Sequence, residues 1–202
     1  MRRRLRMAFA SLTALSALPA FPAVAGSHHP GVVNFPMDGV KELASPTGVT
    51  VYYVDPGPNA DGDDERPILL RYPTGRTEQI DTFGRSADVS WSPHGDQLVI
   101  TNHIGSNTSD CIAVTPTTSG ARKQSLTSLI ARGHLRKVSK DMLEGDHIYV
   151  SCGRWISPTR VQVEVKGYGC NSAPCTPRSF GHFLLYDFQS GRLTRSARSS
   201  AF

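Results

Sequence analysis

Apolar and polar residues alternate along twelve short runs of this chain, and residues that favour turns separate each run from the next. Such alternation, bounded by Gly, Pro, Asn and Asp, is typical of antiparallel strands joined by tight connections. The runs fall into three successive groups of four. The predicted strands are 40–44, 49–54, 68–72 and 78–82 in the first group, 88–91, 97–103, 111–115 and 123–126 in the second, and 148–155, 161–167, 182–188 and 192–195 in the third.

A Ser-Pro turn stands at the same place in every group, between the first and second predicted strands. The three copies are Ser45-Pro46-Thr47-Gly48, Ser92-Pro93-His94-Gly95 and Ser157-Pro158-Thr159-Arg160. Ser, Pro and Gly at the first, second and fourth positions favour a type I turn that is closed by a glycine in the left-handed conformation. Arg160 replaces this glycine in the third copy, so we expect the third turn to have a different shape.

A second motif recurs between the third and fourth predicted strands, as Thr74-Gly75-Arg76 in the first group and Ser190-Gly191-Arg192 in the third. Self-similarity of this kind indicates a repeat architecture. We therefore predict an all-β fold of three units, each a four-stranded antiparallel meander. The first unit covers roughly residues 38–84, the second 85–128 and the third 147–197.

An insertion of roughly residues 129–146 separates the second unit from the third. Ser139 belongs to the residue types that cap the start of a helix, and Gly145 to those that end one. The sequence therefore predicts a short helical insert near residues 125–146, with a helix that Ser139 caps and that ends at Gly145.

The run from Val89 to Ile100, with the sequence VSWSPHGDQLVI, resembles the repeat of TolB-like β-propellers, whose signature is near W-S-P-D-G-x-x-L. The third unit shares Trp155-Ile156-Ser157-Pro158 with this pattern, and the first unit only Ser-Pro-x-Gly. The resemblance implies propeller blades, with Trp91 and Trp155 packed between neighbouring blades. Because a closed propeller has about four to eight blades, three units would form an open array, a ring closed by two chains, or a sandwich.

Residues 1–25 have the features of a signal peptide. A basic start with four arginines precedes an apolar stretch from Met7 to about Phe21, and Ala23-Val24-Ala25 fits the small-x-small cleavage rule. The apolar stretch is too short to span a bilayer. Residues 1–25 contain no acidic residue, so their removal lowers the net charge from +5 to +1, and we expect no nucleic-acid partner. We predict one domain over residues 26–202, periplasmic or secreted, without a transmembrane segment after cleavage.

Four cysteines follow the predicted cleavage site: Cys111, Cys152, Cys170 and Cys175. An even number of cysteines in an exported protein favours disulfides. A bridge between Cys170 and Cys175 would fix a loop of the third unit, and Cys111 would then pair with Cys152 and link the second unit to the third. Two other connectivities, and a zinc site of four thiolates, are the alternatives.

Two segments contain residue types that bind metals. Asn59, Asp61 and Asp63 alternate in an acidic loop as calcium ligands do, although the glycine of an EF-hand-type loop is missing after them, and a solvated loop is the alternative. If cleavage follows Ala25, the mature chain begins Gly26-Ser27-His28. Its amine, two amides and imidazole would suit Cu(II) or Ni(II), and a disordered polar terminus is the alternative. We expect no other cofactor.

The chain has no G-x-S-x-G motif, no H-E-x-x-H motif and no phosphate-binding glycine loop. Tyr168 stands between two glycines, beside the loop that contains Cys170, and is a candidate binding residue. His103 and His182, near strand ends, are further candidates, and no catalytic residue is predicted. The sequence favours an exported protein that binds another protein or a component of the cell envelope, as a monomer or a homo-oligomer. The alternative is a secreted hydrolase whose catalytic residues meet only in space.

Overall fold

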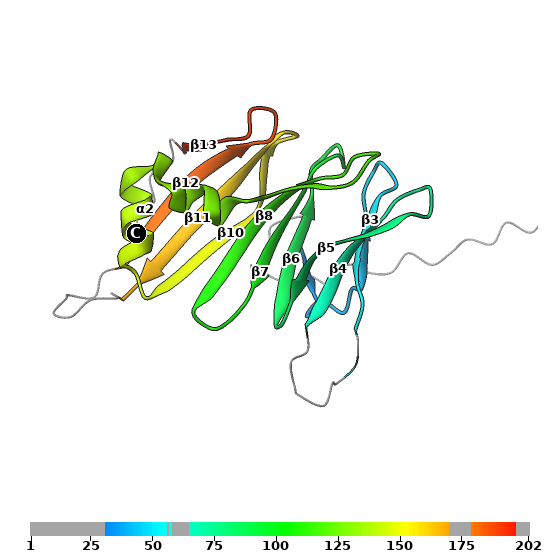
Figure 1. Cartoon of the computed structure of the whole chain (residues 1–202), viewed down its shortest axis with the longest axis horizontal. Helices are drawn as coiled ribbons and strands as arrows, with labels where there is room; N and C mark the ends of the chain where they lie inside the picture. Colours follow the sequence, from blue (N-terminus) through cyan, green and yellow to red (C-terminus); the bar gives the residue numbers. More distant parts are fainter. Residues whose placement is uncertain (1–30, 56, 58–64, 170–178, 197–202) are drawn as a thin grey trace, which may run out of the picture.

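The structure is a computed structural model that describes residues 31–55, 57, 65–169 and 179–196, except for the side chain of His134. Each predicted unit is present as a four-stranded antiparallel meander (Figure 1). The first unit contains β2 (Glu42–Ala44), β3 (Thr50–Tyr53), β4 (Arg66–Arg71) and β5 (Thr77–Phe83). The second contains β6 (Ser86–Trp91), β7 (Leu98–His103), β8 (Thr108–Thr115) and β9 (Arg122–Ser125). The third contains β10 (His147–Ser157), β11 (Arg160–Tyr168), β12 (Phe180–Asp187) and β13 (Arg192–Arg195). The twelve predicted strands are thereby confirmed, with small shifts at their ends.

The three units form two sheets rather than three separate ones. The first unit is a four-stranded sheet by itself, whereas the second and third units belong to one nine-stranded sheet. They are joined where β8 pairs in parallel with β10, through Thr108 opposite Ile148 and Ser109 opposite Tyr149. A further strand that belongs to none of the three units, β1 (Val33–Phe35), pairs with β6. No closed barrel or propeller ring is formed by the described part of the chain.

The second unit is buried on both faces, because successive residues of its strands face different cores. On β7, Leu98 and Ile100 belong to the first core, which lies between the first and second units, while Val99 belongs to the second core. The second core lies between the second unit, the third unit and the helical insert. All three side chains are fully buried, and this explains the unbroken apolar run that the sequence shows at this strand.

Each tryptophan of the repeat reaches back to the preceding unit. The indole Nε1–H of Trp91 donates to the backbone oxygen of Leu43 in the first unit, at 3.0 Å. That of Trp155 donates to Oγ of Ser90 in the second unit, at 3.1 Å. Both indoles thus contact the preceding unit, and the ring of Trp91 belongs to the first core. Ala44, which precedes the first Ser-Pro turn as Trp91 precedes the second, is exposed.

The Ser-Pro turns have the predicted geometry in the first two units. Gly48 and Gly95 hold φ angles of 82° and 75°. Their amides donate to the backbone oxygens of Ser45 and Ser92 at 3.0 and 2.8 Å. In the third unit Arg160 is already part of β11 and pairs with Ser157. Since no described residue other than glycine has a positive φ, this turn is a two-residue hairpin that does not need glycine.

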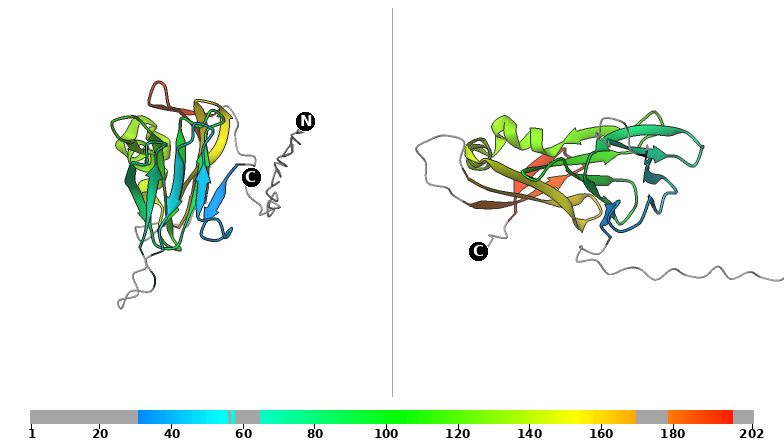
Figure 2. Two further views of the ribbon diagram at one scale, coloured as in Figure 1. Left: turned by 90° about the vertical axis from the view of Figure 1, so that its right-hand side faces the viewer. Right: turned by 90° about the horizontal axis from the view of Figure 1, so that it is seen from below.

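The helical insert consists of α1 (Leu126–Leu129), a π-helical turn (Ile130–His134) and α2 (Arg136–Glu144). It lies along one face of the third unit's strands (Figure 2). The prediction that Ser139 caps the helix is wrong, because Ser139 lies buried inside α2 and donates through Oγ to the backbone oxygen of Ile130 at 2.7 Å. Ser125 caps α1 instead, and it accepts from the amide of Ser128 at 3.0 Å. The end of α2 at Gly145 is confirmed.

A disulfide joins Cys111 on β8 to Cys152 on β10, as predicted. Both cysteines belong to the second core, so the bond crosses from the second unit to the third inside the protein. Cys170 and Cys175 lie outside the described residues.

Candidate functional site: a pocket between the first and second units

Four connections between strands meet at one end of the first two units and surround a pocket of about 460 Å³. Alternate connections of a meander lie at the same end of its strands, so the repeat itself brings these segments together. The pocket is lined by Thr47, Val49, Tyr72, Pro73, Thr74 and Arg76 of the first unit and by Gly95, Asp96, Pro116, Thr117 and Thr118 of the second.

The two Ser-Pro turns pack directly against each other beside this pocket. Thr47 donates through Oγ1 to the backbone oxygen of Gly95 at 3.0 Å. A Cβ atom on Gly95 would lie 2.5 Å from Cδ of Pro46, so only glycine allows this close approach. The recurring turn motif therefore contributes to the contact between the units as well as to each hairpin.

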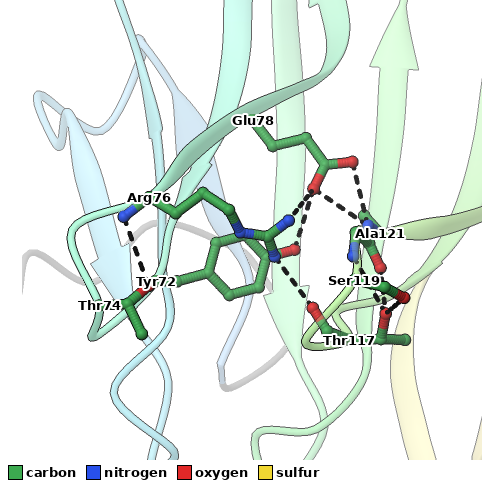
Figure 3. A network of polar contacts seen from close by, with 8 residues as sticks. Tyr72, Thr74, Arg76, Glu78, Thr117, Ser119 and Ala121 are labelled. Carbon is green, nitrogen blue, oxygen red and sulfur yellow. Dashed lines mark hydrogen bonds and ion pairs between the residues drawn. The ribbon is translucent and has the colours of Figure 1, made fainter.

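A network of polar contacts forms the side of the pocket near β5 (Figure 3). The guanidinium of Arg76 lies over the ring of Tyr72, 3.8 Å from its centroid. Arg76 also donates to the backbone oxygen of Thr117 at 3.0 Å, and its Nη1 is 3.7 Å from Oε2 of Glu78. Glu78 in turn accepts from the backbone amide of Ala121 and from the hydroxyl of Tyr72, at 3.0 and 3.2 Å. Side chains of the first unit thus hold the β8–β9 connection of the second unit in place.

The charges of this network are balanced within it. Burial, together with the nearby Glu78 carboxylate, raises the pKa of Tyr72, so its phenol stays protonated and remains a hydrogen-bond donor. The charge of Arg76 is offset by that of Glu78. What the pocket offers to a ligand is therefore mainly apolar surface from Val49, Pro73 and Pro116, with the threonine hydroxyls and the exposed Asp96 near it.

The candidate binding residues from the sequence lie at three other places. Tyr168 is 49% exposed and stacks on the ring of His147 at 4.3 Å. His182 lies under the helical insert, where its Nε2 is 2.7 Å from Oδ2 of Asp141. His103 is 3.0 Å from Asp88 on the neighbouring strand. None of these three residues lines the pocket between the first and second units.

The pair of His103 and Asp88 resembles part of a catalytic triad, since Ser86 stands opposite His103 across the strands. However, no hydrogen bond between described residues joins Ser86 to His103. The Nε2 atom, which would face a serine nucleophile in such a triad, contacts Asp88 instead. The described pockets also lie elsewhere. The geometry therefore gives no support to acyl transfer at this pair.

The predicted metal sites at His28 and at Asn59, Asp61 and Asp63 lie outside the described residues. Within the described ranges, no group of three or more His, Cys, Asp or Glu side chains is arranged to hold a metal ion. A second cavity of about 440 Å³ lies between the helical insert and β13, lined by Leu129, Ile130, Leu135, Gly191, Arg192 and Leu193.

Sequence reasoning did not identify Tyr72, Arg76 and Glu78 as site residues. The available signal was the recurrence of Thr74-Gly75-Arg76 as Ser190-Gly191-Arg192, which marks a constrained connection. The partners of Arg76 and Glu78 come from the second unit, 41 and 43 residues further along the chain, and no local pattern connects positions so far apart.

No family model, curated protein or solved structure matches the chain. Among the helices in the described ranges, none combines the length and apolar character that a membrane crossing needs.

Proposed function

We propose that this protein is an exported binding protein, periplasmic or secreted, that holds another protein or a component of the cell envelope in the pocket between its first and second units. The observation that carries the proposal is a pocket of about 460 Å³ with a mainly apolar lining, in which Arg76 is already paired with Glu78 and Asp96 is exposed. Such a pocket suits an apolar side chain of a partner, which acts as an anchor once it is removed from water.

The pocket is held in shape before any partner arrives. Arg76, Glu78 and Tyr72 fix its side near β5, and the contact between Thr47 and Gly95 fixes the two turns. Preorganisation reduces the entropy that binding costs, because few groups need to be ordered on contact.

Export is supported by residues 1–25 and by the disulfide. A bond between Cys111 and Cys152 is stable in an oxidising compartment, as in the periplasm or outside the cell. The mature net charge near zero fits a protein partner better than a nucleic acid.

The three units are proposed to be blade-like repeats similar to those of TolB-like propellers, in an open array that ends at the first and third units. Trp91 and Trp155 each bind the unit before them, whereas no tryptophan precedes the Ser-Pro turn of the first unit, where Ala44 is exposed. Ion pairs lie on the strands of both end units, between Arg71 and Glu42 in the first and between Arg160 and Asp187 in the third. Polar outer faces are typical of terminal units in repeat proteins.

The test is capture of a partner by the mature, oxidised protein from extracts of the native cell envelope, with a variant that fills the pocket. Thr118→Trp places an indole at the rim, and we expect at least a tenfold loss of the captured partner. Thr194→Trp makes the same change at an exposed threonine of the third unit and should leave capture unchanged. Equal capture by both variants would show that the pocket is not the binding site.

A further inference from the structure

Away from the pocket, a second group of polar side chains lies between the first and second units. It consists of Asp81 on β5, Asn102 on β7 and Asp110 on β8. The Nδ2 of Asn102 donates to Oδ2 of Asp81 at 3.2 Å, and Asn102 stands directly opposite Asp110 across the two strands. Side chains opposite each other on neighbouring strands share one face, so Asp110 lies on the same face as Asn102.

A β-bulge brings Asp81 into this position. The register between β4 and β5 shifts after Ile68, which pairs with Asp81, while Leu69 pairs with Gln79. Bulges redirect side chains and are frequent beside functional sites. Here the bulge places a carboxylate on the same face as the apolar side chains of the first core, which include Ile80.

The amide oxygen of Asn102 is buried and accepts no hydrogen bond from any described residue. Asn102 is only 8% exposed. Its orientation is fixed because the amide nitrogen contacts two acceptors, Oδ2 of Asp81 and the backbone oxygen of Thr82, and an exchange of N and O would place oxygen against oxygen. A buried hydrogen-bond acceptor without a donor destabilises the folded state, and a bound cation would satisfy this oxygen.

The charges around this oxygen also favour a cation. The Asp81 carboxylate accepts from Asn102, and the Asp110 carboxylate lies close enough to act on it electrostatically. Asp110 makes a long contact, 3.5 Å from Oγ of Ser125. The neighbouring positive charge is Lys123, whose Nζ donates to the backbone oxygen of Ile80 at 3.2 Å. Lys123 therefore offsets part of the negative charge at Asp81.

We propose that Asp81, Asn102 and Asp110 bind a calcium ion that links the first unit to the second. The three ligands are oxygens, as calcium prefers, and water would complete its coordination. Sites in extracellular proteins bind calcium with Kd values of about 0.1–1 mM, and we expect this range here. The site is separate from the proposed binding pocket, so each proposal can fail without the other.

The test is thermal unfolding and calorimetric titration of the mature, oxidised protein with calcium chloride. A ligand that binds only the folded state stabilises it, so calcium at about ten times Kd or more should raise Tm by about 3–10 °C. Asp110→Asn keeps the shape of the side chain but removes its charge. It should abolish this shift and remove one bound calcium ion per chain.

Two further variants distinguish this site from the acidic loop and from simple neutralisation by Lys123. The double variant Asp61→Asn with Asp63→Asn should keep the calcium response, because those residues belong to the other predicted site. Lys123→Gln should tighten calcium binding several-fold, because it removes the competing ammonium. The proposal is overturned if calcium leaves Tm unchanged, if the loop variant loses the response, or if Asp110→Asn retains it.

Discussion

The two junctions between units share one contact and differ in almost everything else. At each junction a tryptophan donates its indole N–H to the preceding unit. The junction between the first and second units is closed by apolar packing, by the contact between the Ser-Pro turns and by the network around Glu78. The junction between the second and third units has the disulfide and the parallel pair of β8 and β10. The repeated sequence motif therefore determines the one contact that both junctions share, while the remaining contacts differ between the two junctions.

The candidate sites also lie at one junction and not at the other. The junction without a covalent link contains both the pocket and the polar group at Asp81, Asn102 and Asp110. The linked junction is filled by valines and by the disulfide. There the hydroxyl of Thr101 donates to the backbone oxygen of Cys152 and accepts from its amide, at 2.9 and 2.8 Å. We infer that ligand binding belongs to the first junction and covalent stability to the second.

The largest effect is expected when the shared tryptophan contact is removed. Trp91→Ala should lower the free energy of unfolding by about 3–5 kcal/mol, because it empties a buried site of the first core and leaves the oxygen of Leu43 without its donor. Trp155→Ala should cost less, because that side chain is only half-buried and its junction has the disulfide. Urea unfolding of both variants measures the difference. A larger loss at Trp155 would contradict this comparison of the junctions.

The disulfide should have the next largest effect. A double variant, Cys111→Ser with Cys152→Ser, should lose about 2–4 kcal/mol of stability, because the bond closes a loop across 41 residues of sequence. Reduction of the wild-type protein should produce a similar loss in urea unfolding. Reduction of the double variant is the control, and any further loss there would have to come from Cys170 and Cys175. An unchanged double variant would mean that the strand pairing and the packing of the second core hold the third unit without the disulfide.

A smaller effect is expected at the contact between the two Ser-Pro turns. Gly95→Ala should cost about 1–3 kcal/mol, through strain at a φ of 75° and through the clash with Pro46. Gly75→Ala is the matched control, since Gly75 has a φ of 83° but a Cβ atom there would have no neighbouring atom within 4 Å. The difference between the two variants in thermal unfolding measures the contact between the turns. Equal losses would show that strain alone makes glycine necessary at position 95.

The strands of this fold could be predicted from the sequence because the residue patterns that indicate them are local. The alternation of residues, the three Ser-Pro turns and the helix end at Gly145 each lie within a few neighbouring positions. The pairing of Cys111 with Cys152 followed only from the close spacing of the other two cysteines. The prediction from residue type was wrong at Ser139. Serine favours helix starts, but this serine is buried inside α2 and donates to the backbone oxygen of Ile130.

The features that could not be predicted from the sequence depend on contacts between segments that are far apart in the chain. The parallel pair of β8 and β10 joins two units that the repeat pattern treats as separate. Glu78 was not recognised because its partner, the amide of Ala121, is a backbone group with no side-chain signature. The same holds for Asn102, whose importance lies in an acceptor left without a donor among the described residues. Such features become visible only when the units are packed together.

The smallest effect is expected at the ion pairs on the strands of the two end units. A hydrogen bond from Arg160, at 2.8 Å, lowers the pKa of Asp187, and the backbone amide of Ser190 lowers it further. A lowered carboxyl pKa stabilises the fold above the pKa of the unfolded chain, and this stability is lost as the pH falls through the folded pKa. Asp187→Asn should therefore cost about 0.2–1 kcal/mol at neutral pH, as exposed ion pairs do, and nothing once the wild-type carboxyl is protonated. Urea unfolding at neutral and strongly acidic pH measures this, with Glu42→Gln at the ion pair of the first unit as the matched variant. A loss as large as that of Trp91→Ala would show that the ends of the array, and not its junctions, hold the protein together.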